Sequence, residues 1–313
     1  MATATFTEVV DRAIGQALEE AIWDDQIKDN VNQLAGAHRN LLVNGAFEVW
    51  QRGTSGFTTP LGMYTADMWR YVDAGGSGTI AITRESSTKL AASTYALKAV
   101  YTKVAVNSQL TQRIENVAEL RGRYLSLSVW VHQSVASGCR PFIADSAGTT
   151  YGSAVATTGS FVLLTVTRTV DSAATTLDAG VEFQSSGTYY LDNAMLSLSP
   201  VPAPFRPLHP QEELARCQRY YEVHGGVSGA MTFGGYGAAG GGAFQFVPFA
   251  TPKGGVPTMT KNGTWNVANC GQPAATGPTV AGYTLQVTVT ALGAFLTNCN
   301  STDDTITAEW NPP

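Results

Sequence analysis

Tyr124-Leu-Ser-Leu-Ser-Val-Trp-Val131 is the stretch that decides the fold class, because large apolar residues occupy every second position from Leu125 onward. Successive side chains of a β-strand point to opposite faces, so this alternation predicts a strand with one buried face. Comparable short runs recur within residues 40–205, at 79–83, 95–106, 161–170, 180–183 and 188–196. Many short strands separated by turn-rich segments are typical of a β-sandwich. We therefore predict a mostly β protein whose main domain, residues 40–205, is a β-sandwich.

The composition supports this prediction. The chain has 313 residues, which suits two domains and a short appendage better than one core. Only 14% of the residues are charged, well below the usual quarter, while Gly, Ser, Thr and Val are abundant. Such a composition favours antiparallel strands joined by many turns.

A second, smaller β-domain is predicted for residues 206–313. The proline-rich run Pro200-Val-Pro-Ala-Pro204 stiffens the exit from the first domain, and residues 211–222 form a short linker helix. The glycine-dense segment 225–242 is expected to be flexible or tightly turned. Strands are predicted after it, at 244–249, 258–267, 283–289 and 305–310. They indicate a smaller C-terminal β-sandwich.

The N-terminal residues 1–39 have a different pattern, that of a helix with a bend near Trp23. A narrow apolar stripe recurs at three- and four-residue steps and consists of Phe6, Val10, Ile14, Leu18, Ile27, Val31 and Leu34. Such a stripe has no core of its own, so it packs on itself in an oligomer or on another protein. The alternative is a helix that lies on its own β-domain.

Charge and hydropathy exclude two classes of partner. The net charge is -5 and there is no basic cluster, so we expect no nucleic-acid binding. No apolar run approaches the roughly 20 residues needed to cross a bilayer, so we expect no membrane insertion. The first residues also lack the pattern of a secretory signal, which predicts synthesis in a cytoplasm.

The four cysteines, Cys139, Cys217, Cys270 and Cys299, show no metal-binding spacing. Reduced thiols are the default without a secretory route, so we expect these residues to pack as small apolar side chains. Pairing of Cys270 with Cys299 across strands of the last domain stays open.

Several stretches of the sequence resemble a known group of proteins. Asn40-Leu-Leu-Val-Asn-Gly-Ala-Phe-Glu-Val-Trp-Gln-Arg-Gly53 resembles the opening of carbohydrate-binding-module-like jelly rolls in fibre and receptor-binding proteins of tailed phages. The run from Gln112 to Trp130 resembles a later strand of the same domain, and Leu191–Leu196 resembles its closing strand. Leu214-Ala-Arg-Cys-Gln-Arg-Tyr-Tyr-Glu222 is similar to the helix that opens a C-terminal domain common to phage fibre proteins. The N-terminal helix lies outside the resemblance.

The resemblance implies a virion protein, made in the host cytoplasm and assembled as a homotrimer. Its first expected role is that of a tail fibre or receptor-binding protein that attaches to a host surface glycan or protein. The N-terminal helix would then dock in a tail, baseplate or neck adaptor protein. The alternative is a structural fibre or decoration on the head, neck or baseplate without receptor binding. A free carbohydrate-binding protein is a third hypothesis, which the unpartnered N-terminal helix disfavours.

Candidate glycan-binding residues gather in the C-terminal domain. Glycan sites combine aromatic rings with short polar side chains on exposed loops. The candidates of this kind are Phe233, Tyr236, Trp265, Asn262, Asn266 and Tyr283. The alternative is that these aromatic residues pack against sister subunits in the trimer.

No cofactor is expected, with a structural calcium ion as the one possibility. Glu48 and Asp192 lie in elements that can hold calcium in related sugar-binding jelly rolls, and carboxylates suit this ion. The alternative for both residues is a solvated or capping role. The three tryptophans Trp50, Trp69 and Trp130 are expected to fill the sandwich core rather than to bind sugar.

We predict that the chain is not an enzyme. Its four histidines, His38, His132, His209 and His224, are isolated from any nucleophile motif. The glycines of 234–242 lack the Lys-Ser/Thr that ends a phosphate-binding loop. Paired catalytic acids could not be ranked from the sequence.

Overall fold

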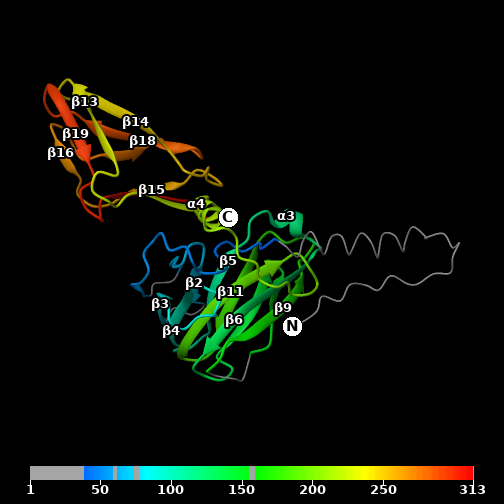
Figure 1. Ribbon diagram of the computed structural model, residues 1–313. Coiled ribbons are helices and arrows are strands. Elements are labelled where there is room, and N and C mark those ends of the chain that lie inside the picture. Colours follow the sequence, from blue (N-terminus) through cyan, green and yellow to red (C-terminus); the bar gives the residue numbers. More distant parts are fainter. Residues whose placement is uncertain (1–38, 59–61, 74–77, 155–158, 313) are drawn as a thin grey trace, which may run out of the picture. The chain divides into compact units, whose positions relative to one another are not determined.

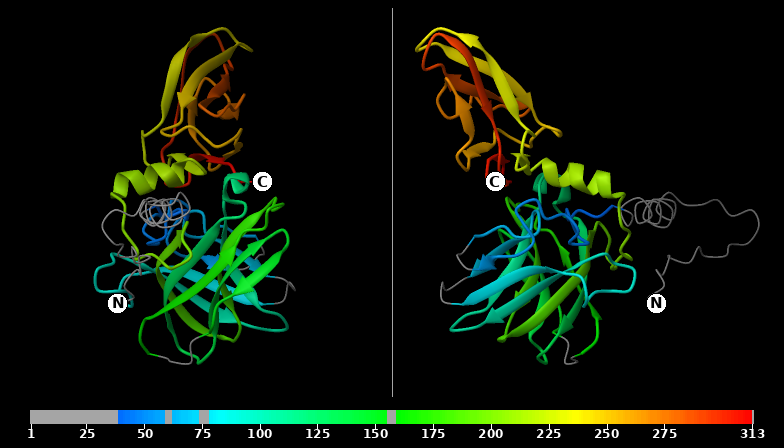
Figure 2. Two further views of the ribbon diagram at one scale, coloured as in Figure 1. Left: turned by 90° about the vertical axis from the view of Figure 1, so that its right-hand side faces the viewer. Right: turned by 60° about the vertical axis from the view of Figure 1, so that its left-hand side comes forward.

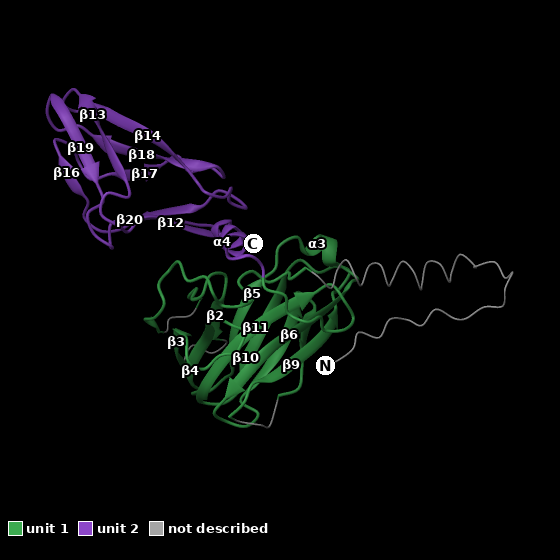
Figure 3. Cartoon of the chain, in the orientation of Figure 1, with its two compact units in different colours: residues 1–207 green, residues 208–313 purple. Residues whose placement is uncertain are grey.

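The computed structural model describes residues 39–58, 62–73, 78–154 and 159–312 (Figure 1). Nearly all of the regular secondary structure of these residues is β-strand, which confirms the predicted mostly β fold class. The chain divides into two compact units, residues 1–207 and 208–313 (Figure 3). The predicted N-terminal helix, with its docking residues Phe6, Val10, Ile14, Leu18, Ile27, Val31 and Leu34, lies outside the described residues.

Unit 1 is a sandwich of two antiparallel sheets (Figures 1 and 2). In spatial order, the six-stranded sheet consists of β1 (Phe57–Thr58), β3 (Thr79–Glu85), β4 (Ala96–Thr102), β11 (Gly187–Ser197), β6 (Tyr124–Gln133) and β9 (Val162–Thr169). The five-stranded sheet consists of β2 (Arg70–Asp73), β5 (Ser108–Arg113), β10 (Leu177–Phe183), β7 (Cys139–Asp145) and β8 (Gly148–Tyr151). A short helix, α3 (Val117–Leu120), connects β5 to β6. From β4 to β7 the chain changes sheet at every connection, as in a jelly roll.

The alternation along β6 builds the core as predicted. Leu125, Leu127, Val129 and Val131 are all buried in the cluster between the sheets. Trp130, which lies between two of them, points to the outer face and is partly exposed. The expectation of a core residue is therefore wrong for Trp130, because the strand has only one buried face.

Trp50 and Trp69 do belong to the core cluster, as expected. The Trp69 ring lies 4.8 Å from that of Phe47, and its indole N–H donates to the carbonyl oxygen of Asn44 at 3.0 Å. The family-like motif at 40–53 is thus a packing element that closes one end of the sandwich.

Unit 2 begins with α4 (Pro210–Gln218) and continues with three antiparallel three-stranded sheets. The first consists of β12 (Tyr221–Gly225), β20 (Thr305–Glu309) and β15 (Thr258–Lys261). The second consists of β13 (Thr232–Gly237), β19 (Gly293–Asn298) and β16 (Asn266–Ala268). The third consists of β14 (Gly242–Pro248), β18 (Gly282–Thr288) and β17 (Ala274–Thr276).

Two predicted boundaries in unit 2 need correction. The helix predicted for 211–222 ends at Gln218, because Tyr221 and Glu222 instead pair with Glu309 and Ala308 of β20. The strand predicted for 258–267 is two strands in different sheets. Gly263, with φ +69°, turns the chain between them, a conformation that glycine adopts without strain.

The glycine-dense segment also differs from the expectation, because it contains the regular strand β13. Here glycine makes room for a neighbouring ring. A Cβ atom on Gly235 would lie 3.0 Å from two ring atoms of Phe295 on the paired strand β19. The Phe295 side chain is buried, so the glycine allows an aromatic ring to pack directly on the backbone.

One buried ion pair joins the start of unit 2 to its centre. Lys253 is 3% exposed, and its Nζ atom lies 2.5 Å from Oε2 of Glu222 and also donates to the carbonyl oxygen of Gln218 at the end of α4. Oε1 of Glu222 accepts hydrogen bonds from the backbone N–H of Ala250 and from Nε2 of His224. Burial alone would raise the pKa of Glu222, but these hydrogen bonds outweigh it and hold the pKa well below its usual range.

We expect Glu222→Gln to destabilise unit 2 by about 3 kcal/mol, because it leaves the Lys253 ammonium buried without its counter-charge. The stabilisation depends on an ionised Glu222, so in the wild type it should be lost as the pH falls below about 4. Hydrogen–deuterium exchange of β12, β18 and β20 in the full chain would measure the effect. Glu212→Gln, at an exposed position of α4, is the control. Equal exchange in both variants would show that the pair contributes nothing.

Candidate functional site

The outer face of the five-stranded sheet in unit 1 holds a group of polar and aromatic side chains. On β10, Ala179, Val181 and Phe183 are buried in the core cluster, so Asp178 and Glu182 lie on the opposite face. The same alternation on the neighbouring strands gives the members of this "polar face": Arg70, Gln109, Thr111, Arg113, Arg140, Phe142, Tyr151, Asp178, Gly180 and Glu182.

The strand register arranges the polar face in rows. One row crosses all five strands, with Arg70 beside Thr111, then Gly180, Phe142 and Tyr151. The next row contains Gln109, Glu182 and Arg140 in neighbouring positions. Arg113 and Asp178 are direct partners in a third row. Five separate chain segments therefore contribute to this face, on which Thr111, Gly180, Phe142 and Glu182 are buried while the arginines, Asp178 and Tyr151 are at least partly exposed.

Arg140 organises one end of the polar face. Its Nη2 and Nε atoms lie 2.7 Å and 2.9 Å from Oε1 of Glu182, which also accepts from Nδ2 of Asn107. The same guanidinium group lies 3.6 Å from the ring centroid of Tyr151, a cation–π contact. The Tyr151 ring is beside that of Phe142, which is buried, yet it remains 38% exposed. The protein thus holds an accessible aromatic ring in a set position.

A second arginine–carboxylate pair lies nearby on the same face. Nε and Nη2 of Arg113 lie 2.9 Å and 3.0 Å from the two carboxylate oxygens of Asp178. Both side chains remain partly exposed, at 24% and 21%. Bidentate pairs of this kind hold donors and acceptors in a fixed plane before any ligand arrives.

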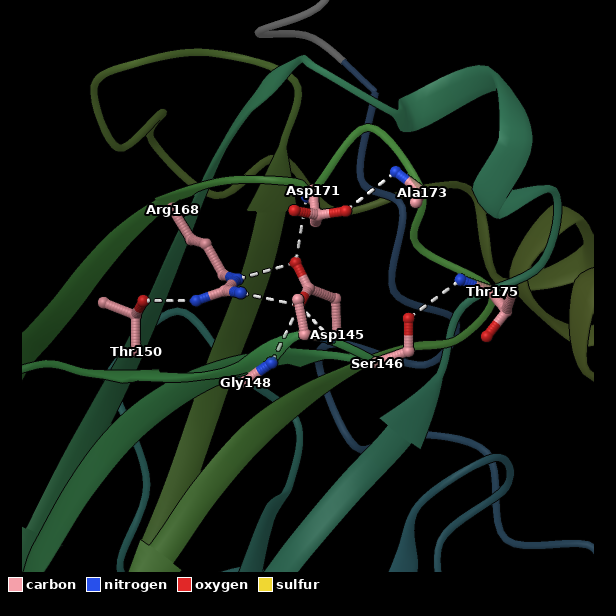
Figure 4. Close-up of polar contacts among 9 residues, drawn as sticks. Asp145, Ser146, Gly148, Thr150, Arg168, Asp171, Ala173 and Thr175 are labelled. Atoms are coloured by element: carbon pink, nitrogen blue, oxygen red, sulfur yellow. Dashed lines mark hydrogen bonds and ion pairs between the residues drawn. The ribbon is translucent and has the colours of Figure 1, made fainter.

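A buried carboxylate fastens the hairpin that carries Tyr151 (Figure 4). Asp145, at the end of β7, accepts hydrogen bonds from Nη2 and Nε of Arg168 at 2.6 Å and 2.8 Å, and from the N–H of Gly148 at 3.2 Å. Arg168 comes from β9 of the other sheet, and its Nη1 atom donates to Oγ1 of Thr150 on β8. The hydrogen bonds from Arg168 lower the pKa of Asp145 to about 2. This network joins the two sheets and positions the residue next to Tyr151.

We expect Asp145→Asn to destabilise unit 1 by about 3 kcal/mol, because Arg168 loses its buried counter-charge. The pKa of Asp145 is depressed, so its contribution in the wild type is complete above about pH 4 and is lost as the pH falls toward 2. Urea denaturation at pH 7 and pH 3 would measure both effects. Glu119→Gln, at an exposed position of α3, is the control. A stability difference that is the same at both pH values would contradict the proposed role of the charge.

The structure corrects two of the glycan-binding residues predicted in unit 2. Trp265 is 2% exposed and Tyr283 is fully buried, and both belong to a core cluster. Tyr283 lies on the same side of β18 as the buried Leu285 and Val287, so it faces the interior. Neither ring has a free surface on which a sugar could stack.

The other four residues predicted in unit 2 lie at or near the surface. Tyr236 is 75% exposed, whereas Phe233 is partly buried and packs edge-to-face on Phe295. Asn262 and Asn266 are exposed, and Asn262 donates to Thr305 Oγ1 at 3.1 Å. The β13–β19–β16 register places Tyr236 and Asn266 toward opposite ends of β19. The structure does not bring the six predicted residues together in one site.

Unit 2 has an exposed apolar surface that the sequence prediction missed. Phe244 and Phe246 on β14 are 62% and 57% exposed, on the side of the strand opposite to the partly buried Val247. There is no Asp, Glu, Lys or Arg in residues 262–302, and Lys253, which is buried, is the only one in residues 223–260. The strands β13, β14 and β16–β19 therefore carry no formal charge. We call Tyr236, Phe244 and Phe246, with these strands, the charge-free surface.

Asp192 holds the loop between β3 and β4 through hydrogen bonds. Its carboxylate accepts hydrogen bonds from the N–H of Leu90 and the hydroxyl of Ser93, both at 2.9 Å. Burial raises the pKa of Asp192 to about 6. These donors agree with the capping alternative, and the described residues contain no group of three or more His, Cys, Asp or Glu side chains that could hold a metal ion. A calcium ion at Glu48 and Asp192 stays a prediction.

The four cysteines are free and buried, so Cys270 and Cys299 do not form a disulfide. The Sγ atom of Cys299 contacts the N–H of Met231 and the carbonyl of Val227, which fits the packing role expected for it. No helix within the described ranges is both long and apolar enough to cross a membrane.

The histidines that the structure describes have structural surroundings. His224 hydrogen-bonds Glu222 and approaches Tyr283 inside unit 2, and His209 caps α4. His132 packs against Tyr190 and Phe161 on the outer face of the six-stranded sheet, at ring distances of 5.2 Å and 5.5 Å. These three rings form a second aromatic group in unit 1. The Nδ1 atom of His132 in this group is buried and has no hydrogen-bond partner within the described part of the chain. This aromatic group is the alternative to the polar face as a candidate binding surface in unit 1.

The sequence matches no family model and no curated protein. Among solved structures, the C-terminal family 22 carbohydrate-binding module of Clostridium thermocellum Xyn10B is similar at 15% identity and a TM-score of 0.35, over 44% of this chain and 89% of the module. The xylan-binding domain CBM22-1 of Paenibacillus barcinonensis Xyn10C is similar at 14% identity and a TM-score of 0.34, over 48% and 97% of the two chains. The enzymatically active domain of tailspike protein 4 of bacteriophage CBA120 is similar at 15% identity and a TM-score of 0.33, over 51% and 21%.

Proposed function

We propose that this protein is a non-catalytic virion component of a tailed phage, a tail fibre or receptor-binding protein that holds a host surface glycan on the polar face of unit 1. The observation that carries the proposal is the prearranged group of Arg140, Glu182 and Tyr151, with the pair of Arg113 and Asp178 two rows away on the same face. The resemblance of residues 40–53 and 214–222 to phage fibre proteins supports the virion location.

The polar face has the chemistry that a sugar requires. Sugar hydroxyl groups both donate and accept hydrogen bonds, while the C–H faces of the ring are apolar and stack on aromatic side chains. Arg140, held by the buried Glu182, supplies donors next to the exposed ring of Tyr151, and the partly exposed Asp178 supplies an acceptor on the same face. Since these side chains already contact one another, little conformational entropy is lost when a ligand binds.

The charge-free surface of unit 2 supports self-association, and we place the contacts of a homotrimer there. Soluble monomers rarely leave a large apolar patch in water, and Phe244 and Phe246 are both more than half exposed. Copies related by a rotation axis meet through repeated surfaces, so a surface without charges brings no like charges together. The N-terminal segment would join a tail, baseplate or neck adaptor protein.

The same surface also favours a second candidate function, that of a structural fibre or decoration on the head, neck or baseplate. Assembly through the charge-free surface requires no receptor. Immunogold labelling of the intact particle separates the two functions, because a receptor-binding protein is expected at the distal tail.

We expect Tyr151→Ala and Arg140→Ala each to weaken glycan binding at least tenfold, because they remove the ring and the group that positions it. Binding of the full chain to a glycan array and to purified bacterial surface polysaccharides would measure this loss. Tyr124→Ala is the matched control, since Tyr124 is 55% exposed at the start of β6 in the other sheet. Loss of binding in Tyr190→Ala alone would move the site to the rival aromatic group, and no binding by the wild type would refute the proposal.

We expect the double variant Phe244→Ser, Phe246→Ser to weaken self-association at least tenfold, because two exposed rings no longer leave water when copies meet. Light scattering coupled to size-exclusion chromatography of the full chain would give the mass as a function of concentration. Leu163→Ser is the control, because Leu163 is 42% exposed in unit 1. A wild type that stays monomeric at every concentration would exclude this interface.

A further inference from the structure

Arg70 differs from the two other arginines of the polar face. It lies on β2, at the edge of the five-stranded sheet, and its neighbour Tyr71 is buried in the core. Arg70 therefore points to the outer face, where it is partly exposed. Its partner across the ladder is Thr111, so it begins the row that ends at Tyr151.

The positive charge of Arg70 is not balanced by a carboxylate of the polar face. Arg113 is paired with Asp178 and Arg140 is paired with Glu182. Within the described residues, the side chain of Arg70 makes no hydrogen bond and no ion pair. Asp73, on the same strand, is buried and accepts from the N–H of Gly78.

This surplus positive charge is local. The whole chain has a net charge of -5, so the cation is not part of a generally basic surface. The remaining members of its row, Thr111, Gly180, Phe142 and Tyr151, are neutral. A free guanidinium group beside a neutral row would pair with an anionic group on a ligand, and its planar fork matches a carboxylate.

We infer that the glycan held by the polar face is acidic and that Arg70 binds the carboxylate of one of its sugars. The inference rests on the function proposed above. The row crosses five strands, and with neighbouring strands about 4.8 Å apart it spans roughly 19 Å from Arg70 to Tyr151. Thr111, Gly180 and Phe142 between them are buried, so Arg70 and Tyr151 are the accessible ends of the row and contact different sugars of one extended chain. Tyr151 provides stacking and Arg70 provides the selection for charge.

The test uses the full chain and three polyuronates, namely polygalacturonate, alginate and hyaluronate, each beside its carboxyl-reduced form. We expect the wild type to bind at least one polyuronate ten or more times more tightly than the reduced polymer. Arg70→Gln should abolish this preference and leave the affinity for the reduced polymer unchanged, whereas Arg70→Lys should keep part of it. Binding of the wild type should also weaken with added NaCl more steeply than binding of Arg70→Gln.

Arg123→Gln is the matched control, because Arg123 is exposed just before β6 and lies outside the polar face. Equal affinity of wild type and Arg70→Gln for every polyuronate would overturn the inference. If neutral glycans then still bind and are lost in Tyr151→Ala, the proposed function stands without the acidic preference. Dextran sulfate serves as a test of charge alone, and binding to it that equals binding to the polyuronates would also overturn carboxylate recognition.

Discussion

The pair of Asp145 and Arg168 is the constraint on which the arrangement of unit 1 depends. The carboxylate comes from the five-stranded sheet and the guanidinium from the six-stranded sheet, so their hydrogen bonds tie the two layers together at one edge. A buried carboxylate is costly unless its oxygens are fully hydrogen-bonded, and here Arg168 and nearby backbone N–H groups supply the donors. The hairpin of β7 and β8 is held at its turn by this network. Tyr151 and Arg140 can therefore form a fixed surface at the other end of the same hairpin.

In unit 2, a buried ion pair likewise joins separate elements of the fold. Glu222 and Lys253 join α4, β12 and the segment after β14, within a domain that otherwise has few charges. The strands β13, β14 and β16–β19 of the same unit carry no charged residue and expose two phenylalanines. These strands are thus left suitable for contacts with other chains.

The residues that give the sequence its family resemblance have mainly structural roles. Trp50 and Trp69 pack in the core, and Gln112 holds the backbone of Val43 through two hydrogen bonds. Asp192 anchors a loop rather than standing free. Most of the polar face is instead built from residues outside these motifs, such as Arg140 and Tyr151, with Arg113 as an exception. A resemblance in the scaffold therefore indicated a type of fold, while the side chains that could select a ligand had to be found from the strand register.

The sequence by itself determined that the protein is mostly β, because alternation such as that of residues 124–131 specifies a strand with two unlike faces. It also indicated the helix after Pro210 and the low proportion of charged residues in the whole chain. Only the tertiary structure decided which face of each strand is buried and which strands are neighbours. Tyr283 and Trp265 have aromatic side chains suited to a sugar, yet packing encloses both in the core of unit 2. Arg70 and Tyr151 are 81 positions apart in the sequence, yet the register places them in one row. The physical reason is that alternation is a local property of the backbone, whereas burial and cross-strand pairing depend on contacts between segments that are distant in the chain.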